Sequence, residues 1–165
     1  MSSNKPITRE RILRILEDQA AKTSRVIAGL DEATLNLPAR GDGWTAKEIL
    51  AHMIAGHEGM LLLAQGRVPG GQALDSFDLN ANNEAQRLAY RDLPLAEILT
   101  RLDEVRGRVR AYIEEVDEAD YQQMVHTPWM GDFPKGQFLI YPALHEGGHR
   151  AELERWRTTL QGEQS

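Results

Sequence analysis

The sequence predicts an all-α protein in which four long helices pack as a four-helix bundle. Apolar residues recur every three or four positions in four long segments, which is the spacing of an amphipathic helix. No segment shows the alternation of apolar and polar residues that is typical of a half-buried strand. A chain of 165 residues is long enough for one substantial core, so we expect residues 1–165 to form a single domain.

The first helix is expected over Thr8–Gly29, where Thr8 can cap the start and Gly29 can end the helix. The apolar positions between these two residues follow helical spacing. Residues 30–43 contain proline and glycine and are expected to connect this helix to the next one.

The second helix is expected from Thr45 to about Gln65, because Thr45 and Glu48 form the pattern of a capping box. It carries His52 and His57, whose rings point about 140° apart at a spacing of five residues, so they cannot both serve one site. His57 lies in the middle of the apolar arc and His52 lies at its edge. Periodicity leaves the choice between them open and slightly favours His57 as the more buried.

Residues 74–91 are polar and rich in asparagine, and we expect a loop that leads into a short helix. A third long helix is expected from about Leu95 to Val116, and Pro94 suits its first turn. Residues 117–135 are expected to form a connector. Its His126 is more simply a loop histidine than a metal ligand.

The fourth helix is predicted to begin near Gly136–Phe138 and carries His145 and His149. At about 100° per residue the two imidazoles lie about 40° apart and one turn apart, so both can reach a single point. Near the start of the helix a proline is tolerated, because the first amides have no partner inside the helix. The stripe that should face the bundle core consists of Pro142, His145, His149, Leu153, Trp156 and Leu160.

Two interpretations of this histidine pair stay open on spacing alone. The pair supplies two of the three protein ligands that an open zinc-type site needs, or the two rings fill space with separate hydrogen bonds. Gly147 and Gly148 beside them indicate either close approach of another helix or room for a ligand.

The letters His145-Glu146-x-x-His149 also match the zinc-protease motif, in which the glutamate is the general base. The extended motif with a third histidine is absent, and no strand-rich lobe is visible in the sequence. We therefore disfavour a protease and expect Glu146 to be a solvated residue beside a ligand.

The composition narrows the function classes. A net charge of −6 argues against nonspecific binding to nucleic acid. No apolar run approaches the roughly 18–20 residues of a membrane span, and no signal-peptide core is visible, so a cytoplasmic location is the default expectation. The chain has no cysteine, so any metal needs nitrogen or oxygen ligands and any thiol must come from outside.

Three segments give the chain a resemblance to a known family: GWTAKEILAHM at 43–53, HTPWMGDFPKGQF at 126–138 and LHEGGHRAELERW at 144–156. Over nearly its whole length the sequence resembles the DinB-like superfamily, the DinB and YfiT relatives, which are four-helix bundles. In that family one histidine of the second helix and an HxxxH pair of the fourth bind a divalent metal. The resemblance thus implies His52, His145 and His149 as ligands, and selects His52 over His57.

The resemblance is weaker for the reaction than for the fold, because the family includes thiol S-transferases that use mycothiol or bacillithiol, a mycothiol-dependent maleylpyruvate isomerase and metal-dependent hydrolases. One hypothesis is an enzyme in which zinc or nickel activates a low-molecular-weight thiol or water against a small electrophile. The electrophile would lie near Trp129 or Tyr141. The other hypothesis is a non-catalytic protein that binds a small molecule or partner, with a structural metal. The oligomeric state stays open, with a homodimer as one outcome.

Overall fold

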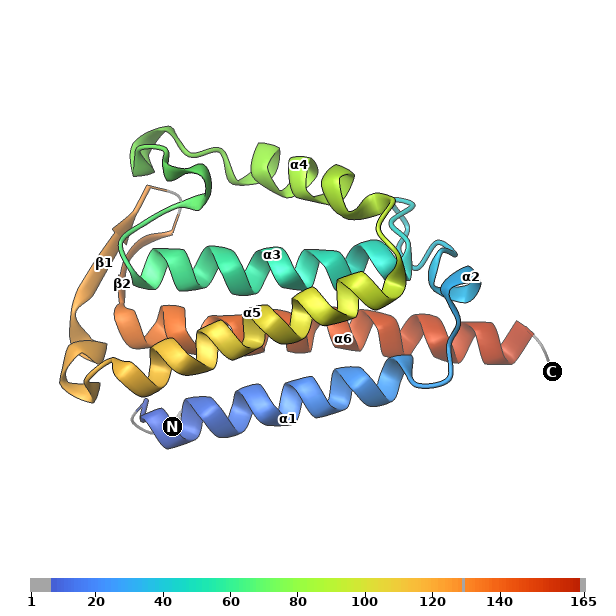
Figure 1. Ribbon diagram of the computed structural model, residues 1–165, viewed down its shortest axis with the longest axis horizontal. Coiled ribbons are helices and arrows are strands. Elements are labelled where there is room, and N and C mark those ends of the chain that lie inside the picture. Colours follow the sequence, from blue (N-terminus) through green and yellow to red (C-terminus); the bar gives the residue numbers. More distant parts are fainter. Residues whose placement is uncertain (1–6, 129, 164–165) are drawn as a thin grey trace.

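Four long helices form the bundle in the computed structural model, which describes residues 7–128 and 130–163 (Figure 1). The prediction of a four-helix bundle is confirmed. These helices are α1 (Arg9–Ile27), α3 (Ala46–Ala64), α5 (Leu95–Glu115) and α6 (Lys135–Glu163). Among the described residues, no helix combines the length and apolar character that crossing a membrane would require.

Shorter elements connect the long helices. The connections carry α2 (Glu32–Leu35), η1 (Pro69–Gly71), η2 (Leu74–Ser76), α4 (Leu79–Arg91), η3 (Glu118–Gln122), β1 (Met124–Thr127) and β2 (Gly131–Pro134). The short helix expected within residues 74–91 is α4, and it covers most of that segment.

The order of the helices in space differs from a simple up-and-down bundle. Figure 1 shows α3 and α5 running in the same direction, because the chain returns along the bundle as α4 between them. α6 packs against α1 and α3, while α3 also packs against α5 and α4. No residue of α4 is fully buried, so α4 covers α3 from outside rather than joining the core.

The helix starts follow the signals in the sequence. The side chain of Thr8 accepts a hydrogen bond from the amide of Arg11 at the start of α1. At the start of α3, Thr45 and Glu48 form the complete capping box that the sequence predicts. Each cap satisfies amides that have no partner inside the helix.

The segment 117–135 differs from the expected connector, because it contains an antiparallel pair of strands, β1 and β2. Val125 pairs with Phe133, whose ring packs edge-on against Phe138 of α6 at 6.2 Å between centroids. Each strand has only four residues, which is too short for alternation to stand out in the sequence. His126 lies on β1 as an exposed residue and contacts Asp132 at 2.7 Å. It is not part of the one group of possible metal ligands found among the described residues.

Pro142 is not near a helix start. α6 begins at Lys135, so Pro142 lies in the helix interior, where it cannot donate the hydrogen bond that the carbonyl of Phe138 would accept. The prediction that this proline is tolerated because it lies near the start of the helix is therefore wrong. The predicted core-facing stripe is sound, because Pro142, Leu153 and Trp156 are all buried.

The core has two apolar clusters, one toward each end of the bundle. On α3 one cluster includes residues up to Ile54 and the other begins at Met60, with His57 between them. On α6, Ala143 and Leu153 belong to different clusters, and Glu146 lies between them. A polar layer thus separates two apolar layers, and the histidines lie near this level.

Candidate metal centre

Three histidines from two helices come together in the structure. His52 projects from α3, and His145 and His149 project from α6, with one ligand atom of each within 4.8 Å of the others. Their ring centroids lie 4.9, 4.8 and 4.5 Å apart. These are the three histidines that the family resemblance implies, and His57 is not part of the cluster.

Glycines allow the helices to approach closely at this point. A Cβ atom placed on Gly56 would lie only 2.3 Å from Nδ1 of His145, so the absence of a side chain there makes room for the ring. A Cβ atom on Gly147 would lie 2.9 Å from Oε1 of Gln19 on α1, whereas one on Gly148 would meet nothing within 4 Å. Close packing therefore accounts for Gly147. The structural role of Gly56 was not foreseen from the sequence.

Burial keeps His52 and His145 uncharged. It lowers the pKa of His52 to about 4, helped by the electrostatic interactions with His149 and Arg40. Burial also lowers the pKa of His145 to about 3, helped by His149 and His52. Neutral imidazole is the form that binds a metal, so these rings are ready to coordinate at neutral pH.

The donor atoms fit a divalent cation. Nε2 of His145 lies 3.2 Å from Nε2 of His149, so two nitrogens that can each carry a lone pair face the same space. Nδ1 of His145 is buried and has no hydrogen-bond partner among the described residues. Three imidazole nitrogens with no carboxylate among them match the donor set of an open zinc-type site.

Glu152 orients one of the three rings. Its Oε2 lies 2.9 Å from Nδ1 of His149, one turn along α6. A carboxylate that accepts a hydrogen bond from Nδ1–H leaves Nε2 with its lone pair toward the cluster. Sequence reasoning missed Glu152, although its position three residues after His149 on one helix was the signal that could have found it.

Glu146 is not a solvated residue, so that prediction is wrong. It is 1% exposed and accepts hydrogen bonds from Thr23 at 2.6 Å, from Nε2 of His57 at 2.8 Å and from Arg106. Burial alone would raise its pKa, but the bonds from His57 and Arg106 outweigh that effect and lower the pKa to about 2.

This ionised carboxylate links all four long helices, because its partners come from α1, α3 and α5. His57 is fully buried, as its place in the apolar arc predicts, but it serves as a hydrogen-bond partner of Glu146 rather than as an apolar filler. Glu146 is thus a structural residue of the polar layer, which agrees with the rejection of the protease reading.

A cavity of about 100 Å³ opens beside His52 and His145, between α3, α4 and α6. Tyr141 lines this cavity and stacks on the His145 ring, with centroids 6.0 Å apart. Tyr141 was expected near the substrate, and the structure places it beside the histidine cluster. Trp129, the other residue expected there, lies outside the described residues.

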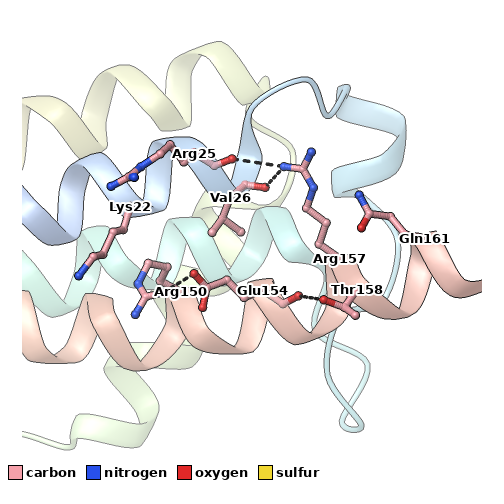
Figure 2. A pocket seen from close by; sticks show the side chains of 8 residues that line it. All are labelled: Lys22, Arg25, Val26, Arg150, Glu154, Arg157, Thr158 and Gln161. Carbon is pink, nitrogen blue, oxygen red and sulfur yellow. Dashed lines mark hydrogen bonds and ion pairs between the residues drawn. The ribbon is translucent and has the colours of Figure 1, made fainter.

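A larger hollow of about 700 Å³ lies between α1 and α6, away from the histidines, and Figure 2 shows its basic lining. Its cationic side chains already have partners. Arg150 pairs with Glu154, and Arg157 donates to the carbonyls of Arg25 and Val26 at the end of α1. We interpret this hollow as a solvated surface with satisfied charges.

The chain matches a known family over most of its length. The family described as DinB superfamily matches residues 15–153, which is most of the chain.

Several relatives are named as putative metal-dependent hydrolases, and two of them come from Geobacillus. One, from Geobacillus kaustophilus, is 28% identical over 134 residues, which covers 79% of this chain and 74% of the relative. The other, from Geobacillus thermodenitrificans, is 28% identical over 100 residues, which covers 60% of this chain. The matched part is 55% of that second relative's own length, so just over half of that protein is represented.

Solved structures share the fold. YfiT from Bacillus subtilis, described as having an unusual four-helix bundle topology, has a TM-score of 0.70 at 17% identity, over 98% of this chain and 92% of YfiT. A mycothiol-dependent maleylpyruvate isomerase has a TM-score of 0.73 at 17% identity, over 88% of this chain and 60% of the isomerase. The colibactin self-resistance protein ClbS, solved with double-stranded DNA, has a TM-score of 0.74 at 15% identity, over 92% of this chain and 96% of ClbS.

Proposed function

The chain belongs to the DinB superfamily, and on that premise we propose that it is a metal-dependent enzyme that acts on a small electrophile. The observation that carries this proposal is the convergence of three imidazoles beside a cavity. His52, His145 and His149 would hold a divalent cation, with zinc and nickel both suited to imidazole ligands.

Such a cation, when bound, supplies Lewis acidity that makes water or a thiol nucleophilic near neutral pH. The protein contributes the rest. Neutral imidazoles leave the positive charge of the cation uncompensated, and Glu152 holds the ring of His149 in place. The cavity beside His52 and His145 offers the electrophile a partly enclosed position next to the cluster.

Thiol S-transfer is the first form of this activity that we propose. The chain has no cysteine, so a transferase would need a low-molecular-weight thiol such as bacillithiol or mycothiol as cosubstrate. The shared fold with a mycothiol-dependent isomerase supports a thiol of this kind.

Hydrolysis is the second candidate, and the names of the two Geobacillus relatives favour it. The same three imidazoles would serve either reaction, because only the incoming nucleophile differs.

We further propose that the partner is a small molecule rather than nucleic acid, and that the protein works in the cytoplasm as one domain. The net charge of −6 opposes binding to phosphate backbones, although the structural neighbour ClbS was solved with DNA. All residues of the proposed site come from one chain, so the site is complete without a second copy.

Metal analysis tests the site. We expect purified protein to carry about one divalent metal per chain and His149→Ala to lose most of it, because an open site of this type needs three protein ligands. Elemental analysis of both proteins measures this. Equal metal content in wild type and variant would contradict the assignment.

Turnover tests the reaction. Metal-loaded protein is assayed against chlorinated aromatics and epoxides, with and without bacillithiol, mycothiol or glutathione. Turnover that needs an added thiol supports the transferase, and turnover without thiol supports the hydrolase. No turnover with metal fully bound would favour a binding protein with a structural metal.

A further inference from the structure

We propose that the cavity beside the histidine cluster selects a compact, uncharged ligand with an apolar body and one hydrogen-bonding group, an inference that rests on the proposed function. At about 100 Å³ the cavity is smaller than the roughly 300–1,000 Å³ typical of pockets for drug-sized ligands. A small ligand therefore fits it better than a long one. The apolar walls come from α3, α4 and the segment between them: Ala55, Met60, Leu63, Pro69, Phe77 and Leu79.

No aspartate, glutamate, lysine or arginine belongs to the part of the cavity lining that the structure describes. In the metal-free protein, a charged ligand would lose its hydration against these walls without gaining an opposite charge from them. An uncharged ligand avoids that cost, so the walls themselves favour neutral molecules.

Two amides add polar groups to the cavity, whose lining also includes Tyr141 and two histidines. Asn82 and Asn83 on α4 both line it and are half-buried. Within residues 7–128 and 130–163, neither side chain makes a hydrogen bond. An amide group can donate and accept, so these side chains are available to a carbonyl, amide or epoxide oxygen of the ligand.

Substitutions at two glycines of α3 distinguish the role of the cavity from the role of the metal cluster. A Cβ atom on Gly59 would meet nothing within 4 Å, so a larger side chain there can grow into the open cavity. A Cβ atom on Gly56 would collide with the ring of His145. We therefore expect Gly59→Leu to block the cavity while keeping the metal, and Gly56→Ala to displace His145 and lose the metal.

The first experiment measures the affinity of benzamide, a compact neutral probe, for zinc-loaded protein by chemical-shift titration. Gly107→Leu is the matched control, because Gly107 is an exposed helical glycine of α5 with nothing within 4 Å of its Cβ position. Wild type and control should bind alike, while Gly59→Leu should bind at least about tenfold more weakly with the same zinc content. Unchanged affinity in folded Gly59→Leu would overturn the assignment of the cavity.

The second experiment tests charge with benzoate, which has nearly the shape of benzamide. In chelator-treated wild type no cation attracts the carboxylate, so benzoate should bind at least about tenfold more weakly than benzamide. Equal binding would overturn the selection for neutral ligands.

The third experiment tests the amides and does not depend on the Gly59 variant. Replacing both Asn82 and Asn83 by alanine should weaken benzamide binding about fivefold, the effect of a lost hydrogen bond, while toluene binding stays unchanged. An equal loss for toluene would contradict a polar role for these residues. If Gly59→Leu keeps its turnover as well as its zinc, the subsite alone is refuted. If wild-type protein binds no zinc, the proposed function is refuted.

Discussion

His52 and His57 lie on the same helix, but their rings contact different groups. We expect His52→Ala to lose the metal with little change in melting temperature of the metal-free protein. His57→Ala should keep the metal and lose roughly 2–3 kcal/mol of stability, because Glu146 would lose a buried hydrogen bond. That loss corresponds to roughly 4–12 °C for a domain of this size. Elemental analysis and thermal unfolding measure the two effects, and the reverse pattern would refute the assignment.

Glu152 offers a second test at the scale of one residue. Glu152→Gln should weaken metal binding roughly 10–100-fold, because the amide accepts less strongly from Nδ1 of His149. Glu154→Gln is the control, since Glu154 lies on the same helix and pairs with Arg150 instead. Competition with a chromogenic chelator gives both affinities. If the two variants bind metal equally well, Glu152 has no positioning role.

At the scale of one element, the start of α3 depends on its capping box. Thr45→Ala removes the acceptor for the amide of Glu48 and should cost about 1 kcal/mol of unfolding free energy. Thr100→Ala is the control, because Thr100 is exposed and bonds only to the carbonyl of Ala96 within α5. Urea unfolding of the two variants measures the difference. A cost in Thr100→Ala as large as in Thr45→Ala would argue against the cap as the cause.

The short helix α4 packs on α3 without burying any of its own residues fully, and Arg87 links the two helices. Its guanidinium donates to Glu48 at 2.7 Å and lies 5.6 Å from the centroid of the Trp44 ring. We expect Arg87→Ala to speed amide hydrogen exchange in residues 79–91 and leave the metal content unchanged, because α4 has no fully buried residue to hold it.

Arg110→Ala is the control for this exchange experiment, since Arg110 pairs with Glu17 and Glu114, away from α4. Exchange measured by mass spectrometry should respond in α4 only to the first variant. The same protection of α4 in both proteins would show that Arg87 does not hold it.

For the whole molecule, the buried histidines predict a pH dependence of stability once the metal is removed. The pKa values of His52 and His145 are about 4 and about 3 in the folded protein, below the usual value of 6.5. Between pH 6.5 and these lower values, the two histidines bind protons in the unfolded chain but not in the folded chain. The free energy of unfolding should therefore fall as pH drops below 6.5, by up to roughly 1.4 kcal/mol per pH unit for each histidine.

The titration of Glu146 contributes little to the change in unfolding free energy between pH 7 and 5. Its folded pKa of about 2 lies below the usual 4.5, so its contribution is fully present above pH 4.5 and is lost only as pH falls toward 2. Urea unfolding with chelator at pH 7, 6 and 5 tests the slope. His145→Gln should make it shallower, and equal stability at all three pH values would contradict the buried, neutral state of the rings.

The sequence alone determined the helical fold, most helix positions and the pairing of His145 with His149. These are properties of local spacing, since a helix fixes which side chains share a face. The capping box of α3 is likewise local, as Thr45 and Glu48 are three residues apart. The third histidine of the cluster came from resemblance to a family, because periodicity slightly favoured His57, which lies outside the cluster.

Only the tertiary structure decided the roles that depend on contacts between distant segments. Glu146 has the polar character of a surface residue, and its burial follows from partners on α1, α3 and α5, the nearest of them 40 residues away along the chain. Gly56 matters only because the His145 ring lies against it. The cavity, too, exists because α4 returns across α3. Such contacts join residues that spacing along the chain does not relate, so they appear only when the helices are packed.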